Sequence, residues 1–285
     1  MAPKFGTAGI PESFYQLGYK KTQQLPEYLK RFNLNAFEYQ CGRGVKISRE
    51  AAENFGKICA EGGIQLSLHA PYYISLSSIE TEKRENSIKY ILESAAAAKA
   101  MGAKRVVVHS GSCSKMTREQ ALDLAKDTLA KAAKMLDENG CSEIRLCPET
   151  MGKVNQLGTL DEVLELCTID ERFIPCIDFG HLNARSFGGL KGISDYEAVF
   201  DAIENKLGNS RLKEFHSHFS KIEYTNPGGE KRHLTFADAV YGPDFEPLAE
   251  LTAKRNCSPV FICESAGTQA EDALYMLNAY KQFEK

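Results

Sequence analysis

The 285-residue sequence contains no apolar run that reaches the roughly 18 residues needed for a membrane span. Its N-terminal stretch, MAPKFGTAGIPESF, also lacks the charged-then-apolar pattern of a signal peptide. We therefore expect a cytoplasmic protein with no membrane partner. The net charge of −3 gives no global attraction to nucleic acid or anionic lipid, so any nucleic-acid binding has to rest on local basic patches.

Two further patterns are missing from the sequence. The nine cysteines show no C-x-x-C spacing, and a chain of this length does not need disulfides, so we expect reduced thiols packed in the core. The glycines form no G-x-G-x-x-G or G-K-[ST] motif, and those at positions 42, 44, 228 and 229 lie in loops. A glycine-rich phosphate-binding fingerprint is therefore absent.

What the sequence does contain is a regular alternation of apolar segments and helical patterns. Eight segments are predicted as strands: Lys4–Ala8, Asn35–Gln40, Ile64–His69, Lys104–His109, Glu143–Glu149, Phe173–Ile177, Leu212–His218 and Pro259–Glu264. Helices are predicted over Gln23–Phe32, Ser48–Gly62, Thr81–Met101, Thr117–Asn139, Leu160–Cys167, Tyr196–Asn205, Pro247–Arg255 and Thr268–Phe283. The longest loop follows the seventh strand.

This alternation requires a parallel sheet, because each helix returns the chain to the start of the next strand. Eight units in a chain of 285 residues favour a closed (β/α)8 TIM barrel over an open doubly wound sheet. No break in composition marks a domain boundary, so we expect one TIM-barrel domain over residues 1–285. In such barrels the functional site lies at the C-terminal ends of the strands.

The segment Arg172–Arg185, RFIPCIDFGHLNAR, shows the kind of strand end that recurs along the chain. An apolar run ends in Asp178, and His181 follows after a glycine. This pattern indicates a buried strand opening into a loop, so Asp178 and His181 emerge together. That arrangement suits a metal ion.

Reading off the strand ends gives a set of nitrogen and carboxylate ligands: His69, His109, Glu149, Asp178, His181, His216 and Glu264, with His218 and His233 in or after the seventh strand. Ligands of these types suit zinc, manganese or iron, and a carboxylate can bridge two ions. The cysteines nearest these positions, Cys147, Cys176 and Cys263, are interpreted as packing residues.

Structural roles compete with this interpretation at individual positions. A lone histidine such as His69 or His109 is more often structural than a ligand. Arg145 or Lys153 could neutralise a buried carboxylate, and Asp178 could cap the turn before His181. The convergence of so many such residues on one end of one barrel favours a metal site.

The residues also carry a family resemblance. The segments LHAPYYISLSS, VVVHSGS, PETMGKVNQLGT, CIDFGHLNAR, LKEFHSHFSK, the RH of GGEKRHLTF and FICE follow in order from His69 to Glu264. In these segments the chain resembles the endonuclease IV family of apurinic/apyrimidinic endonucleases, within the xylose-isomerase-like barrel superfamily. The resemblance implies a cluster of two or three metal ions, usually zinc, with Mn²⁺ or Fe²⁺ as alternatives.

The resemblance also implies which residues hold each ion. One ion would take His69, His109 and Glu149; a second would share Glu149 and take Asp178, His216 and Glu264; the third would rest on His181, His233 and a carboxylate. The family has an acidic residue where this chain has Lys231, so Glu230 or His218 is a possible replacement ligand.

By the same resemblance, the protein is expected to be a monomeric hydrolase in DNA repair. It would cut damaged double-stranded DNA 5′ to an abasic sugar, with Glu149 and Glu264 as catalytic residues. Tyr72 matches a family residue that contacts the distorted DNA. Basic residues on the same predicted rim could meet phosphates: Arg43, Arg185 and Lys221, with Lys46, Lys153 and Lys191. Each of these charges taken alone is more often simply solvated.

Two other functions remain open on the sequence. Glu149, Asp178, His216 and Glu264 alone also match the pattern of single-metal sugar isomerases and epimerases, in which two glutamates move a proton at a ketose carbon. A non-catalytic relative that keeps the barrel and binds metal is the third possibility, because the segment Glu230–His233 departs from the family pattern. The number of bound metal ions separates the nuclease from the sugar enzyme, because the sugar enzyme binds one ion and the nuclease two or three.

Overall fold

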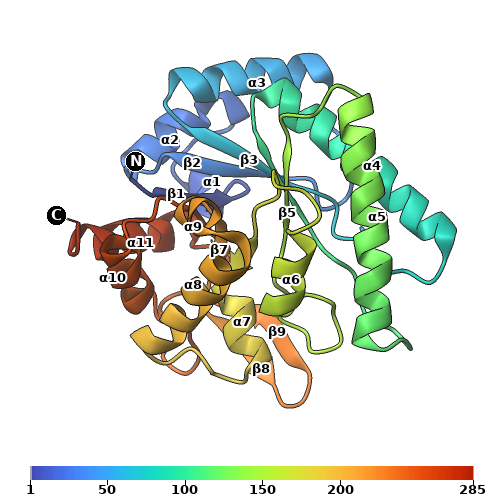
Figure 1. The fold of residues 1–285 in the computed structure, drawn as a ribbon. Coiled ribbons are helices and arrows are strands. Elements are labelled where there is room, and N and C mark those ends of the chain that lie inside the picture. Colours follow the sequence, from blue (N-terminus) through green and yellow to red (C-terminus); the bar gives the residue numbers. More distant parts are fainter. Residues whose placement is uncertain (1, 285) are drawn as a thin grey trace.

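The computed structural model describes residues 2–284, and it is a barrel of parallel strands surrounded by helices (Figure 1). Eight strands form one sheet in the order β5-β4-β3-β2-β1-β10-β7-β6. Their bounds are β1 Lys4–Ala8, β2 Ala36–Gln40, β3 Gln65–His69, β4 Arg105–Val108, β5 Arg145–Pro148, β6 Cys176–Asp178, β7 His216–Phe219 and β10 Val260–Cys263. The predicted (β/α)8 barrel is confirmed.

The two edge strands of this sheet, β5 and β6, meet at a short seam that closes the barrel. A single parallel bridge joins Glu149 to Cys176 there. The Thr150 N–H also donates to the Cys176 carbonyl at 3.0 Å, and the Ile174 N–H donates to the Leu146 carbonyl at 3.3 Å. The seam therefore has fewer backbone contacts than the regular ladders elsewhere in the sheet.

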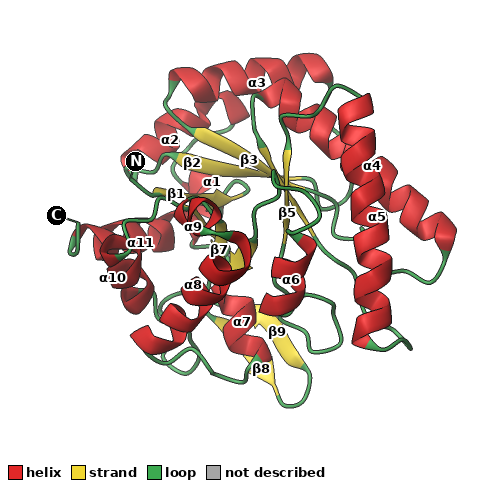
Figure 2. Cartoon of the chain, viewed as in Figure 1, coloured by secondary structure: helices red, strands yellow, loops and turns green. Residues whose placement is uncertain are grey.

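Helices pack around the outside of the barrel (Figure 2). Their bounds are α1 Glu12–Gln16, α2 Leu25–Arg31, α3 Arg49–Glu61, α4 Thr81–Met101, α5 Arg118–Glu138, α6 Leu160–Leu166, α7 Phe179–Arg185, α8 Ile193–Leu207, α9 Asn209–Lys213, α10 Glu246–Lys254 and α11 Gln269–Lys281, with a 3₁₀ turn η1 at Thr22–Gln24. None of the helices within residues 2–284 is long and apolar enough to cross a membrane.

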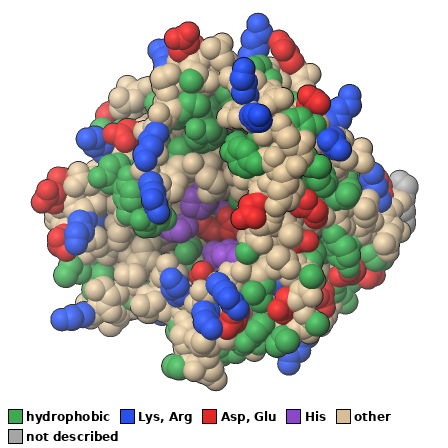
Figure 3. Space-filling view, turned by 180° about the vertical axis from the view of Figure 1, so that it is seen from behind, with side chains coloured by type: hydrophobic (Ala, Val, Ile, Leu, Met, Phe, Trp, Pro, Cys, Tyr) green, Lys and Arg blue, Asp and Glu red, His purple; other side chains and the backbone are tan. Residues whose placement is uncertain are grey.

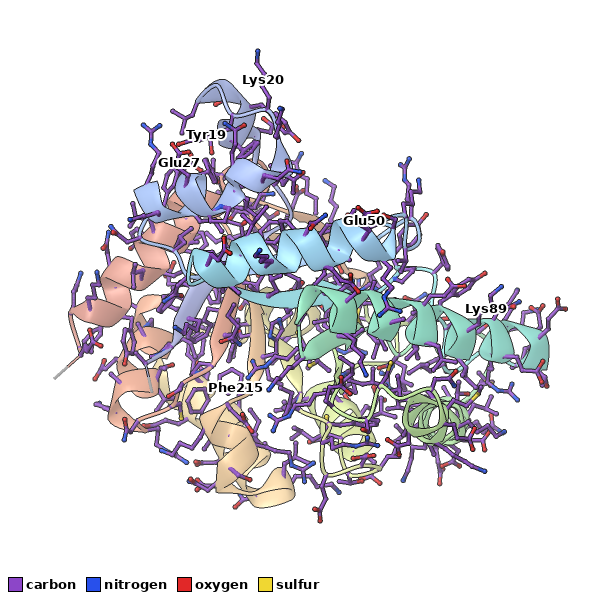
Figure 4. The ribbon with its side chains drawn as sticks, turned by 90° about the horizontal axis from the view of Figure 1, so that it is seen from above. Tyr19, Lys20, Glu27, Glu50, Lys89 and Phe215 are labelled. Carbon is purple, nitrogen blue, oxygen red and sulfur yellow. The ribbon has the colours of Figure 1, made fainter. Side chains whose placement is uncertain are left out.

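Alternation along each strand separates an outer apolar layer from the barrel interior. Large side chains such as Phe37 and Phe261 point outward into the main core between sheet and helices. Phe215, labelled in Figure 4, belongs to this layer and packs edge-on against Phe200 of α8 at 5.4 Å between ring centroids. The nine cysteines are free and buried, in agreement with the expected reduced core thiols.

Smaller apolar side chains fill part of the barrel interior. Val107, Cys147, Ile174 and Cys176 form one small buried cluster, which supports packing roles for the two cysteines. Gly6 faces Ala36 of the neighbouring strand, and a Cβ at Gly6 would lie only 2.0 Å from the Ala36 carbonyl oxygen. Only glycine therefore fits at position 6 without displacing the neighbouring strand.

Several helix ends follow the expected capping chemistry. The Ser48 hydroxyl accepts from the Ala51 N–H at the start of α3, and Thr117 and Gln120 form a reciprocal capping box at the start of α5. Gly102 ends α4 in the left-handed conformation, with φ of 75°. These signals explain why the predicted helix bounds agree closely with the observed ones.

The structure differs from the predicted elements in the second half of the barrel. The loop expected after Asp178 is instead α7, which Asp178 caps by accepting from the His181 N–H at 2.7 Å. The long loop after β7 contains an antiparallel hairpin, β8 Ile222–Thr225 and β9 Gly229–His233, which lies beside α7 (Figure 1). Short polar segments of this kind lack the apolar periodicity from which strands and helices are predicted.

Glu162 anchors the start of α6 to α5. Its carboxylate is buried, accepts from the Gly158 and Thr159 N–H groups at 2.8 and 2.9 Å, and receives two hydrogen bonds of 2.7 Å from Arg118. Burial acts to raise the pKa of Glu162, but Arg118 and the backbone donors lower it below its usual value. The charged form is therefore the one that stabilises the fold.

We expect Glu162→Gln to lower the free energy of unfolding by about 2 kcal/mol at neutral pH, because charged hydrogen bonds are lost in a buried site. Since the folded pKa is depressed, the contribution of Glu162 is fully present above the unfolded value and is lost as pH falls through the folded value. Urea unfolding at several pH values measures this. A wild-type advantage that does not shrink in acid would contradict the assignment.

Candidate metal centre

The candidate site is a hollow on the face of the barrel opposite to that viewed in Figure 1. Figure 3 shows histidine and acidic side chains gathered in this hollow. They come from the C-terminal ends of β3, β4, β5, β6, β7 and β10 and from the hairpin β8–β9, as the barrel architecture requires.

Glu149 is the hub of the site. The residue directly follows β5 and its carboxylate is 1% exposed. Its Oε2 lies 3.3 Å from His69 Nε2 and 3.1 Å from His109 Nε2, while its Oε1 lies 3.0 Å from His218 Nδ1 and 3.5 Å from His181 Nδ1. Each carboxylate oxygen thus faces a different pair of imidazoles, which is the geometry of a bridging ligand.

Asp178 brings the end of β6 into the same group. Its Oδ1 caps α7, but its Oδ2 is fully buried and accepts no hydrogen bond, although His181 Nδ1 lies 3.2 Å away. A buried carboxylate oxygen without a donor is costly unless a cation satisfies it. The two predicted roles of Asp178, turn cap and candidate ligand, are therefore divided between its two oxygens.

His218, and not His216, completes the central group. His218 Nδ1 lies 3.0 Å from Glu149 and 3.5 Å from Glu264. Glu149, Asp178, His218 and Glu264 offer ligand atoms that all lie within 4.8 Å of one another. The prediction from sequence was His216 in this set, with His218 only as a possible ligand.

The physical reason for this exchange is the pleat of β7. The two histidines point to the same side of the strand because they are two residues apart, but His218 lies one step closer to the C-terminal end. His216 lies deeper and donates from Nε2 to Glu38 at 2.8 Å, with the Arg105 guanidinium 3.5 Å from its Nδ1. Cys176, His216 and His218 could also approach one ion, but the neighbouring Arg105 cation disfavours binding there.

Neighbouring opposite charges shift the pKa values of the carboxylates and imidazoles in the site. Burial would raise the pKa of Glu149, but His218, His109 and His69 hold it well below its usual value. Burial would lower the pKa of His69 and His181, yet the neighbouring carboxylates raise each to about 9. Protons on these imidazoles thus balance the buried carboxylates, and a divalent cation could replace them.

A second ligand group lies beside the first. His181 Nε2 is 3.5 Å from Glu230 Oε2, and the ligand atoms of His181, Glu230 and His233 lie within 4.8 Å of one another. The Lys231 ammonium points to Glu223 instead, at 2.5 Å, on the outer side of the hairpin. Glu230 therefore occupies the acidic position that the sequence left open.

The residues present fit bound metal ions. The carboxylate of Asp178 has an unsatisfied buried oxygen, the donor atoms are imidazole nitrogens and carboxylate oxygens, and Glu149 spans two groups. A further group of three has ligand atoms within 4.8 Å of one another: His69, Glu149 and His218. The Ser220 hydroxyl lies 2.8 Å from His233 Nδ1 and thereby orients this ring.

Gly152 leaves the space that the second group needs. A Cβ at this position would lie 2.6 Å from Glu230 Cβ and 2.9 Å from His181 Cδ2. We expect Gly152→Ala to displace both side chains and to remove about one metal ion per chain, with the central group intact, as overpacking shifts neighbouring atoms. Elemental analysis of purified protein measures the loss.

The matched control is Gly192→Ala, because a Cβ at Gly192 meets nothing within 4 Å and its φ of −153° suits any residue. This variant should keep the metal content of the wild type. Equal metal content in the two variants would show that the second group does not hold an ion.

The predicted DNA-contacting residues divide into free and engaged side chains. Tyr72 is 61% exposed on the loop after β3, and Arg43 is exposed on the loop after β2, where the Tyr72 N–H reaches the Gly42 carbonyl.

By contrast, the Arg185 guanidinium donates to four backbone carbonyls, those of residues 151, 153, 154 and 156. Lys221 donates to the Asp238 carbonyl and pairs with Asp244 at 3.3 Å. Arg185 and Lys221 thus hold loops in place.

Sequence reasoning missed one polar residue of the interior, Glu38 on β2. Its carboxylate is fully buried and lies 2.8 Å from His216 Nε2 and 2.9 Å from His218 Nε2. The signal was available, because an acidic residue in the middle of the apolar segment NAFEYQ needs a partner inside the barrel.

Comparison with known proteins defines the class to which this fold and site belong. A model of the xylose isomerase-like TIM barrel family matches residues 26–280, and the chain belongs to this family.

Within this family the chain is similar to endonuclease 4 proteins. It is 31% identical over 184 residues to a probable endonuclease 4 of Mycoplasma pneumoniae, a match that spans 62% of this chain and 60% of that protein. An uncharacterized protein of Methanocaldococcus jannaschii is 32% identical over 98% of this chain and 97% of its own length. The predicted resemblance is confirmed.

Two solved structures show the same fold. Endonuclease IV from Thermus thermophilus matches with a TM-score of 0.67 at 20% identity, covering 99% of this chain and 98% of that chain. A D-tagatose 3-epimerase-like protein matches with a TM-score of 0.72 at 18% identity, covering 98% and 97%. These matches show the fold alone, and the function of the chain has to be argued from its site.

Proposed function

We propose that this protein is a metal-dependent phosphodiesterase that cuts double-stranded DNA 5′ to abasic sites. The observation that carries the proposal is the second ligand group, His181, Glu230 and His233, beside the central group around Glu149. A single-metal sugar enzyme does not require this second group. The similarity to endonuclease 4 proteins supports the same function.

Bound metal ions would supply Lewis-acid stabilisation of the phosphate and a means of activating water. His69, His109 and Glu149 would hold one ion, and Glu149, Asp178, His218 and Glu264 would hold a second. His181, Glu230 and His233 would hold a third. Zinc fits this donor set, and Mn²⁺ or Fe²⁺ fits the carboxylate-rich central group.

The protein's own residues would bind and orient the DNA. Tyr72 offers an exposed ring on the rim for stacking at the distorted lesion, and Arg43 offers a free cation for a phosphate. Glu149 and Glu264 would act as catalytic residues by fixing the positions of the reacting groups around the phosphate. The chain would act on its substrate as a monomer.

The test uses metal-loaded protein and a duplex that contains one abasic site, with the intact duplex as the substrate control. We expect nicking on the 5′ side of the lesion and two or three metal ions per chain. His233→Ala should lose one ion and most of the activity. Lys231→Ala, the matched control from the same strand, should keep both because its side chain faces Glu223. A metal-loaded protein that does not nick the abasic duplex would overturn the proposal.

A single-metal sugar epimerase is the second candidate function. The observation that favours it is that Glu149, Asp178, His218 and Glu264 form a complete four-residue group by themselves. The engagement of Arg185 and Lys221 also leaves fewer cations at the mouth for a DNA backbone. One ion per chain together with epimerisation of a ketose would establish this function in place of the nuclease.

A further inference from the structure

Glu38 is a fully buried carboxylate on β2, one layer below the metal ligands. The Ser67 hydroxyl donates to its Oε2 at 2.9 Å, and the Gln40 side-chain amide donates to its Oε1 at 3.2 Å. Glu38 belongs to none of the groups within residues 2–284 that could bind metal.

The two oxygens of Glu38 serve two different histidines. His216 Nε2 lies 2.8 Å from Oε2, and His218 Nε2 lies 2.9 Å from Oε1. The contact with His218 is close in distance but is out of line for a hydrogen bond, so a small turn of the ring is needed to complete it.

The orientation of His216 follows from its neighbours. Arg105 can only donate, and its Nη1 lies 3.5 Å from His216 Nδ1, which must therefore accept. His216 then carries its proton on Nε2 and donates it to Glu38 Oε2. Of the histidines within residues 2–284, only His218 faces the other oxygen of Glu38, Oε1.

His218 therefore lies between three carboxylates, one at the Nε2 edge of its ring and two at the Nδ1 edge. Nε2 faces Glu38, while Nδ1 faces Glu149 at 3.0 Å and Glu264 at 3.5 Å. Only Nδ1 can bind an ion in the central group. A carboxylate that accepts the remaining ring proton fixes the tautomer and the angle of a histidine ligand and increases its basicity.

We propose that Glu38 is a positioning residue that presents Nδ1 of His218 to the metal ion of the central group. This role rests on the metal centre of the proposed function. It is not a catalytic role, because Glu38 would act through His218. The same geometry explains the pattern of two histidines on β7: His216 hydrogen-bonds to one oxygen of Glu38, and His218 faces the other.

The test compares zinc binding by wild-type protein and Glu38→Gln, titrated from the apo form against a chelator of known affinity. The amide cannot accept from both histidines, because only one of its two terminal atoms is an acceptor. We expect zinc affinity of the central group to fall by about 10- to 100-fold, the usual effect of removing such a partner. In zinc-loaded wild-type protein, nitrogen NMR of labelled histidine should show His218 protonated on Nε2.

Ser67→Ala is the matched control, because it removes one donor to Glu38 on Oε2 and leaves the contact with His218 in place. This variant should bind zinc like the wild type. Thermal unfolding of the apo proteins separates a loss of stability from a loss of affinity. If Glu38→Gln does not fold, Glu38→Asp withdraws the carboxylate from His218 and should give the same direction of change.

The outcomes distinguish this proposal from the proposed function. Wild-type protein that binds no zinc would overturn the metal centre and everything based on it. Wild-type protein that binds zinc, together with a folded Glu38 variant of unchanged zinc affinity, would overturn only the positioning role. A His218 that carries its proton on Nδ1 in the loaded protein would also contradict it.

Discussion

If the proposed function holds, Glu149→Gln is expected to remove metal from the central site and to lower the rate of DNA nicking by about 10³-fold or more. The residue faces four imidazoles and supplies an oxygen to each of two candidate ions. An amide has one acceptor atom in place of two and carries no charge, so it cannot bridge two cations. Losing several kcal/mol of electrostatic stabilisation of the transition state corresponds to a rate loss of this size.

Two measurements check the result: the number of ions per chain by elemental analysis, and single-turnover nicking of the abasic duplex. Glu53→Gln on α3 is the matched control, because it makes the same chemical change at an exposed ion pair with Arg49. Unchanged metal content in Glu149→Gln would show that Glu149 is a structural acceptor for protonated histidines and not a ligand.

Gly6→Ala is expected to cause a larger loss of stability than Glu162→Gln or Gly152→Ala. The added Cβ would lie 2.0 Å from the Ala36 carbonyl oxygen and 2.3 Å from its carbonyl carbon. Both are backbone atoms of a paired strand, so β1 and β2 have to separate to relieve the contact. Overpacking commonly costs about 1–3 kcal/mol, and a backbone clash this close should cost at least about 3 kcal/mol.

Urea unfolding followed by circular dichroism measures this effect, with Gly192→Ala as the control for the Gly-to-Ala change itself. Adding Ala36→Gly to Gly6→Ala should not restore stability, since the contact is with the backbone of residue 36 and not only with its side chain. A fully stable Gly6→Ala protein would mean that β1 and β2 are farther apart than in this structure.

The barrel could be predicted from the sequence because its signals are local and repeated. Each buried parallel strand is a short apolar run, and caps such as Ser48 and Gly102 mark the helix ends. The hairpin β8–β9 could not be predicted in the same way. It is half exposed, and its position is set by contacts with other segments, such as the bridge between Lys153 and Gly229.

The site could be predicted to the level of the strand end but not to the level of the individual ligand. Strand periodicity puts both His216 and His218 inside the barrel. Which of them faces the central group depends on how far along the barrel axis each lies: His216 lies level with Glu38, and His218 reaches Glu149. The position of Glu230 depends on the turn of the hairpin and on the space beside Gly152. Long-range geometry of this kind is not encoded in any short motif.

The seam between β5 and β6 would give a metal ion bound at the candidate site a mechanical role. The backbone joins these strands sparsely, and the Thr150 hydroxyl adds a side-chain link by accepting from the Asp178 N–H at 2.8 Å. Glu149 lies at the end of β5 and Asp178 at the end of β6. A cation bound by both would therefore link the two strands across the seam. Part of the binding energy would then appear as resistance to unfolding, and apo protein would open first at this line.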